Sequence, residues 1–168
     1  MRTLLLMRHA KSDWDADFES DHERPLNDRG VHGARLMGRV LAGRGLAPNL
    51  VVSSTAVRAR TTAELAVDSG EWDCALRLDR ALYESGPAGV LAAASTAPDV
   101  PSLMLVGHQP TWSLLVRELT DETVDMKTAA VAVVEIGIDS WRPLTGAEGK
   151  LVEVLFPGDF AGSEWDRE

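Results

Sequence analysis

The sequence predicts an α/β fold in which a largely parallel sheet lies between two layers of helices. Short apolar runs alternate along the chain with segments whose apolar residues recur at helical spacing, an order typical of parallel strands joined by helices. Two β-prone runs then follow one another near the C-terminus, separated by turn residues. We therefore expect a three-layer α/β/α sandwich whose mostly parallel sheet ends in a C-terminal β-hairpin at one edge.

The first half of the chain predicts two strands and two helices. The apolar run Leu4-Leu5-Leu6-Met7 is too short for a helix of its own, so we expect a buried strand. Asn27 is a good N-cap for the first helix, and Gly43 and Gly45 mark where that helix stops. The expected elements are a strand at 3–7, a surface loop at 10–26, a helix between Asn27 and Gly43, a strand at 50–52 and a helix at 56–67.

The second half of the chain predicts two further strands, two further helices and the C-terminal hairpin. Leu103-Met104-Leu105-Val106 is the clearest strand of the chain, and Pro110 suits the first turn of the helix that follows it. Leu82-Tyr83-Glu84 is expected in the loop after a weak third strand. The expected elements are strands at 74–76 and 103–106, a short helix at 89–97, a helix from 110 to about 119, and hairpin strands at 129–136 and 150–156.

Length and composition favour one globular domain. With 168 residues, 45% of them hydrophobic, we expect a single domain over residues 1–157 and a frayed acidic tail over 158–168. The single cysteine, Cys74, cannot form an internal disulfide, and no signal peptide or membrane span is recognisable, so a cytoplasmic location follows by default. The net charge of −9 argues against nucleic-acid binding.

Polar residues follow three of the expected strands. The first strand ends at Arg8-His9, the second at Ser53 with Arg58 one turn into the next helix, and the fourth at His108. Carboxyl ends of parallel strands meet at one edge of a sheet, where ligands bind in open α/β folds. A cation in the first turn of a helix opposes the helix dipole by about 0.3–1 kcal/mol, and a bound anion would reverse that sign. Taken singly, Arg58 could be an exposed side chain and each histidine structural. Together they predict a site for a small anionic group.

These residues also carry a family resemblance. The segments LMRHAKS (6–12), SSTAVRARTTA (53–63), LYE (82–84) and VGH (106–108) resemble the histidine phosphatase, or phosphoglycerate-mutase-like, superfamily. RHAKSDW (8–14), RPLNDRG (24–30) and VGHQP (106–110) are most similar to its SixA-type phosphohistidine phosphatase branch. The resemblance runs from residue 3 to about 157, and it implies the phosphoglycerate-mutase-like form of the sandwich.

The resemblance implies a role for each site residue. His9 would be the nucleophile that passes through a phosphohistidine intermediate, while Arg8, Arg58 and His108 would hold the phosphate oxygens. The reaction would need no metal or other cofactor. Weaker correspondences make Glu84 a candidate general acid/base and Arg24 and Ser12 candidate substrate contacts, with capping or solvation as the alternative for Ser12.

The function implied is a metal-independent phosphatase that removes phosphate from phosphohistidine in a protein. The segment after Leu78 is long enough for one short helix and no lid, and an open site would admit a protein surface as well as a small phosphorylated molecule. Two alternatives stay open: a small-molecule phosphomonoesterase on the same site, and a non-catalytic phosphate-binding module. No nucleic-acid or membrane partner is expected. Trp14 and Trp112 are expected to pack rather than to line the site.

Overall fold

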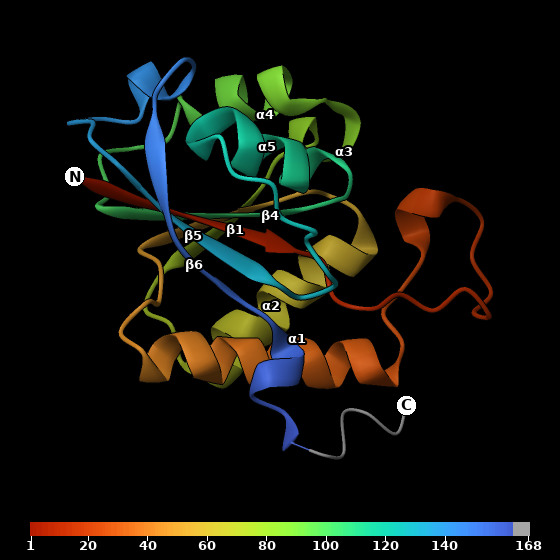
Figure 1. Cartoon of the computed structure of the whole chain (residues 1–168). Helices are drawn as coiled ribbons and strands as arrows, with labels where there is room; N and C mark the ends of the chain where they lie inside the picture. The colour runs from red at the N-terminus through yellow and green to blue at the C-terminus, as the bar shows by residue number, and fades with distance from the viewer. Residues whose placement is uncertain (163–168) are drawn as a thin grey trace.

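A six-stranded sheet forms the centre of the computed structural model, which describes residues 1–162 (Figure 1). The strands lie in the order β3-β2-β4-β1-β5-β6. The first four are parallel to one another, whereas β5 is antiparallel to β1 and β6 is antiparallel to β5. This confirms the predicted sandwich with its C-terminal hairpin. The strands are β1 (Arg2–Arg8), β2 (Leu50–Ser53), β3 (Ala75–Leu78), β4 (Ser102–Gly107), β5 (Val131–Ile136) and β6 (Gly149–Leu155).

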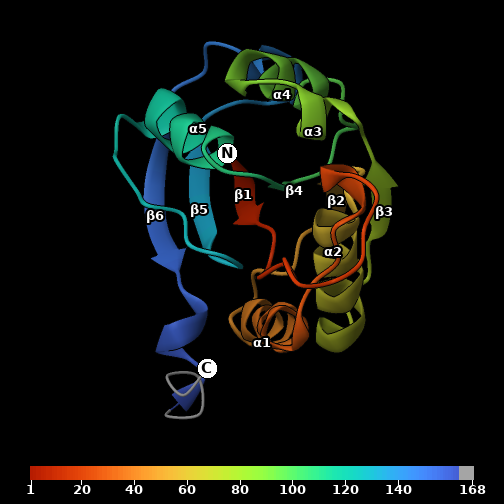
Figure 2. The ribbon, with the colours of Figure 1, turned by 90° about the vertical axis from the view of Figure 1, so that its right-hand side faces the viewer.

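Helices cover both faces of the sheet (Figure 2). One face carries α1 (Asp28–Gly43) and α2 (Val57–Gly70), and the other carries α3 (Ala81–Glu84), α4 (Pro87–Ala94) and α5 (Thr111–Thr120). Right-handed crossovers explain this division. The chain moves outward from β1 to β2 to β3 and then returns to β4, and the reversal places the later helices on the opposite face. Within residues 1–162, none of the helices is both long and apolar enough to cross a membrane.

Alternate residues of the central strands enter two separate cores. Leu4 and Leu6 of β1 pack in the cluster that α4 and α5 complete. Leu5 and Met7 pack on the other face, in the cluster that α1 and α2 complete. A strand buried on both faces has no polar side to alternate with, which is why these strands read as continuous apolar runs.

Several expected boundaries differ from the structure. Leu82-Tyr83-Glu84, expected in a loop, lies in α3, whose start is held by Asp79 because its Oδ1 accepts from the Ala81 N–H at 2.9 Å. The next helix begins at Pro87 and ends at Ala94, earlier than the expected 89–97. Residues 157–159 form a turn of 3-10 helix, η3, beside α1, so the chain remains structured past 158, where the tail was expected to begin. Residues 163–168 lie outside the described residues.

Gly107, the last residue of β4, leaves room for a buried tryptophan. A Cβ at this position would overlap the six-membered ring of Trp112, which is fully buried and donates from Nε1 to the Leu105 carbonyl at 3.2 Å. We expect Gly107→Ala to lower the free energy of unfolding by about 1–3 kcal/mol, because a packed core must shift to accept the methyl group. Urea unfolding measures this. Gly43→Ala at the end of α1, where the new methyl group meets open space, should be neutral or stabilising; equal losses in both variants would contradict the packing argument.

Candidate active site

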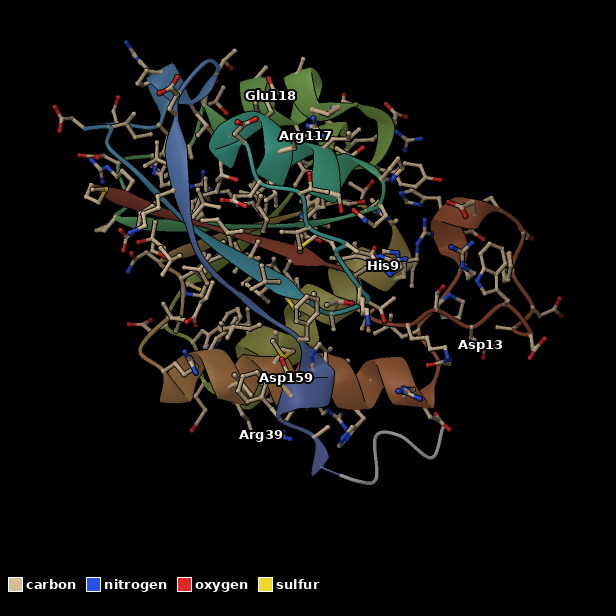
Figure 3. All side chains as sticks on the ribbon, viewed as in Figure 1. His9, Asp13, Arg39, Arg117, Glu118 and Asp159 are labelled. Carbon is tan, nitrogen blue, oxygen red and sulfur yellow. The ribbon has the colours of Figure 1, made fainter. Side chains whose placement is uncertain are left out.

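The carboxyl ends of β1, β2 and β4 lie side by side, because β4 is hydrogen-bonded between the other two strands. His9 follows β1 (Figure 3) and His108 follows β4, and their ring centroids are 5.3 Å apart. Arg58 comes from the first turn of α2, the helix that follows β2. The fold therefore brings together residues from distant parts of the sequence at one edge of the sheet.

A pocket of about 340 Å³ opens at this edge. The wall combines residues that follow the strands with residues of the loop between β1 and α1. Among the described residues that line it, there are four lysine or arginine residues, two histidines and no aspartate or glutamate. The lining residues are Arg8, His9, Lys11, Ser12, Trp14, Arg24, Arg58, His108, Gln109 and Thr128. Such a wall suits a small anion.

His9 is held in one tautomer. Its Nδ1 lies 2.6 Å from the Ala10 carbonyl oxygen, which can only accept, so Nδ1 carries the proton and donates it. The lone pair of Nε2 is then available in the pocket. Burial lowers the pKa of His9 to about 3, and His108 acts in the same direction, against the hydrogen bond to Ala10. The ring, only 7% exposed, is therefore neutral and nucleophilic near neutral pH.

His108 is fixed by a serine that follows β2. Its Nε2 lies 2.8 Å from Ser54 Oγ, and the same Oγ accepts from the Ala56 N–H at 3.1 Å. The Ser54 hydroxyl can donate its own proton to Nε2, in which case the neutral ring carries its proton on Nδ1. Burial lowers the pKa of His108 to about 4, with a further lowering from Arg58. The ring of Tyr83 meets the His108 ring edge to face, with 5.5 Å between the centroids. His108 is thus a neutral, oriented hydrogen-bonding group.

The two lowered pKa values predict that acid destabilises the fold. An unfolded histidine titrates near 6.5, so between that pH and about 4 the unfolded chain binds more protons than the folded chain. The free energy of unfolding should therefore fall as pH falls through this window, by about 2 kcal/mol from His9 alone near pH 4.5. Urea unfolding at pH 7 and near pH 4.5 measures the loss. His9→Gln should show a smaller pH-dependent loss, and an unchanged loss would refute the assignment.

Asp21 joins the loop to the rest of the site. Its Oδ1 accepts from Arg24 Nη1 at 2.5 Å, and its Oδ2 accepts from Arg58 Nη2 at 3.0 Å and from the Tyr83 hydroxyl at 2.9 Å. Arg58 Nη1 also donates to the Asp21 carbonyl at 2.7 Å. Although burial acts to raise it, the pKa of Asp21 is lowered to about 2 by these three side-chain hydrogen bonds. The carboxylate therefore orients two arginines that are only 5% and 6% exposed.

Buried donors without acceptors gather in this pocket. Within the described part of the chain, the buried side-chain nitrogens that lack a hydrogen-bond partner are Arg8 Nε, Arg58 Nε and His108 Nδ1. The other end of Arg8 is anchored, since Nη1 donates to the Met126 carbonyl at 3.0 Å. An unpaired buried donor costs about 1–3 kcal/mol, so three of them in one place favour a ligand that brings acceptor oxygens. A phosphoryl group is such a ligand.

The remaining candidates lie in different places. Ser12 lines the pocket and accepts from Arg24 Nε at 3.0 Å. Glu84 does not line it: the carboxylate pairs with Arg80 one turn earlier, and the side chain is 54% exposed. The expectation that Trp14 packs is wrong, because it is 70% exposed and lies under Arg24, whose Cζ is 3.6 Å from a ring centroid. Trp112 is buried as expected.

Three supporting residues were missed from the sequence. Asp21 and Ser54 contact the arginines and His108 as described, and Thr62 accepts from the Ala10 N–H at 2.9 Å while donating to the Arg58 carbonyl at 2.7 Å. Thr62 thereby ties the residue after His9 to α2. Among residues 1–162, no three His, Cys, Asp or Glu side chains are grouped as a metal site would require.

Comparison with known proteins identifies relatives that cover most of the chain. The family model of the histidine phosphatase superfamily (branch 1) matches residues 4–87. A structure from Nakamurella multipartitia assigned to phosphohistidine phosphatase SixA is 31% identical, with a TM-score of 0.83 over 93% of this chain and 96% of its own. A structure of the protein histidine phosphatase SixA complexed with tungstate is 27% identical, with a TM-score of 0.77 over 94% of this chain and 98% of its own. An uncharacterized protein of Mycobacterium leprae is 31% identical over 165 residues, which cover 90% of this chain and 99% of the relative.

Proposed function

The chain belongs to the histidine phosphatase superfamily and is a phosphatase, and from this premise we propose that it removes phosphate from phosphohistidine in a protein through a phosphorylated His9. The observation that carries the proposal is the fixed tautomer of His9, which leaves the Nε2 lone pair available in a pocket of cations. The likeness to the SixA structures, one of them with the oxyanion tungstate, supports the substrate class.

The proposed reaction has two steps. His9 Nε2 attacks phosphorus, the P–N bond to the substrate imidazole breaks, and that imidazole leaves after taking up a proton. Water then attacks the phosphorylated His9, which releases inorganic phosphate and restores the free imidazole. Arg8, Arg58 and His108 would hold the phosphoryl oxygens through both steps and stabilise the charge that develops on them, with Arg24 and Ser12 as outer contacts. The cationic wall makes a route without metal feasible.

The absence of a carboxylate from the pocket wall, among the described residues, supports phosphohistidine over an ordinary phosphate ester. An alkoxide is a poor leaving group and needs a proton from a general acid, whereas an imidazole leaves readily. Glu84, the candidate acid, pairs with Arg80 outside the pocket, so a role for it would require the side chain to turn. The helices α3 and α4 contribute Leu82, Val90 and Leu91 to the core, and neither helix contributes a residue to the described pocket lining.

Parallel hydrolysis of two substrates tests the proposal. A protein domain that bears phosphohistidine and p-nitrophenyl phosphate are each incubated with the enzyme in the presence of EDTA. We expect rapid dephosphorylation of the protein and slower ester hydrolysis, both insensitive to EDTA. Fast ester hydrolysis with an untouched protein would indicate a small-molecule phosphomonoesterase, and phosphate binding without turnover of either would indicate a binding module.

Asp21 is the positioning residue whose loss should weaken the site without removing a phosphate contact. We expect Asp21→Ala to lower kcat/KM by about tenfold, mainly through kcat, because Arg24 and Arg58 lose their shared anchor. Steady-state kinetics on the phosphohistidine domain measures this. Glu19→Ala removes the same charge from an exposed position in the same loop and should change kcat/KM less than twofold. A gain of activity in Asp21→Ala would mean that the carboxylate competes with phosphate instead of positioning the arginines.

A further inference from the structure

A second pocket, of about 560 Å³, adjoins the phosphate pocket. The two pockets share Lys11 and Thr128 in their walls. On the far side the second pocket reaches the end of β6 and η3, where Asp159 lies beside α1 (Figure 3). A ligand whose phosphoryl group occupies the first pocket can therefore extend directly into the second. The lining residues are Lys11, Arg29, Lys127, Thr128, Phe156, Pro157, Gly158 and Asp159.

Cationic side chains outnumber acidic ones in the wall of this second pocket, whereas the protein as a whole is acidic. The chain has a net charge of −9 and only three lysines, yet two of them, Lys11 and Lys127, line this pocket together with Arg29. Asp159 is the one acidic residue in the described lining. A local excess of cations on an acidic protein selects anionic groups at that place while the rest of the surface repels them.

The cations of the two pockets differ in kind. In the phosphate pocket Arg24 and Arg58 are almost fully buried and are held by hydrogen bonds, as bidentate recognition of a phosphoryl group requires. In the second pocket Lys11 and Lys127 are exposed, and a lysine offers a mobile point charge with no fixed geometry. Exposed lysines suit carboxylates on the surface of a partner, where they add specificity more than affinity.

We propose that the second pocket binds acidic side chains next to the phosphohistidine of the protein substrate. The apolar wall of Phe156 and Pro157 would receive the aliphatic part of a glutamate, and Lys127 and Lys11 its carboxylate. This inference rests on the proposed function, because it presumes a protein substrate in the first pocket. It adds a sequence preference, for acidic residues beside the modified histidine, that the phosphate pocket alone does not supply.

Binding of two peptides tests this preference without requiring turnover. Both carry a non-hydrolysable phosphohistidine analogue, phosphoryl-triazolylalanine, flanked by glutamates in one peptide and by glutamines in the other. The wild-type protein should bind the glutamate peptide several-fold more tightly, and this advantage should vanish between about 0.05 M and about 0.5 M NaCl. Lys127→Glu should weaken the glutamate peptide about fivefold and the glutamine peptide less than twofold. Lys150→Glu, the same charge change at an exposed position on β6, should leave the ratio of the two Kd values unchanged.

The outcomes separate this inference from the proposed function. Equal affinity for the two peptides, or an equal loss for both in Lys127→Glu, would overturn the second pocket as a carboxylate site. An equal effect of Lys150→Glu would assign the preference to overall charge and would also overturn it. Hydrolysis of the corresponding phosphohistidine peptides is followed in parallel. If these are not hydrolysed while the glutamate preference and its loss in Lys127→Glu remain, the proposed function fails and the acidic-peptide site stands.

Discussion

Replacement of His9 by alanine is expected to lower phosphatase turnover by at least about 10⁴-fold and to abolish phosphoryl transfer to the protein. The argument depends on the hydrogen bond from Nδ1 to the Ala10 carbonyl, which fixes Nε2 as the unprotonated nitrogen, and on burial, which keeps the ring neutral. No other group in the described pocket lining combines these two properties, because His108 has its Nε2 engaged with Ser54. Loss of the nucleophile should therefore not be compensated by a neighbour.

Labelling distinguishes loss of the nucleophile from loss of binding. Wild-type protein quenched during turnover of a radiolabelled phosphohistidine substrate should carry a label that is labile to acid and stable to alkali, as phosphorus–nitrogen bonds are. His9→Ala should carry none, although inorganic phosphate should still bind through the arginines. His32→Ala, a histidine of α1 outside the pocket lining, should label and turn over like the wild type. Acid-labile label on His9→Ala would assign the nucleophile to another residue.

The architecture could be predicted because it depends on patterns that are local in sequence. Leu4 to Met7 and Leu103 to Val106 are buried on both faces, so each strand is a continuous apolar run. The helices α1, α2 and α5 bury residues at helical spacing. The convergence of Arg8-His9, Arg58 and His108 followed from strand direction alone. The apolar pattern could not predict α3, because this helix has only four residues, too few to show a helical period. Its start depends instead on the hydrogen bond from the Ala81 N–H to Asp79.

The supporting contacts of the site could not be predicted because they depend on how a loop returns to the sheet. Asp21 stands in an aperiodic acidic loop, and nothing in its neighbourhood in sequence distinguishes it from Asp13, Asp15 or Asp17. Its importance comes from contacts with Arg58 and Tyr83, which lie 37 and 62 positions away. Trp14 was misjudged for the same reason: a tryptophan is usually buried, but here the loop leaves it at the rim beneath Arg24.

Arg58 is expected to show the second largest effect on catalysis. We expect Arg58→Lys to lower kcat/KM on the phosphohistidine domain by about 10²–10³-fold, comparable with removal of one preorganised donor from an oxyanion site. Arg58 is 6% exposed, its two terminal nitrogens are held by Asp21, and its buried Nε lacks an acceptor until a ligand supplies one. Lysine retains the charge but has no planar fork, so it can neither keep both contacts to Asp21 nor present a fixed donor to phosphate.

Arg60 provides the matched control, because it lies two residues further along α2 and points away from the pocket. Its Nε pairs with Glu64 at 3.3 Å on the exposed face of the helix, and it is not among the pocket-lining residues. Arg60→Lys should change kcat/KM less than twofold, since an exposed pair of this kind is worth less than about 1 kcal/mol. Equal kinetics for Arg58→Lys and the wild type would show that charge alone suffices at this position. In that case the geometry of the fork, and with it the anchoring by Asp21, would not determine the rate.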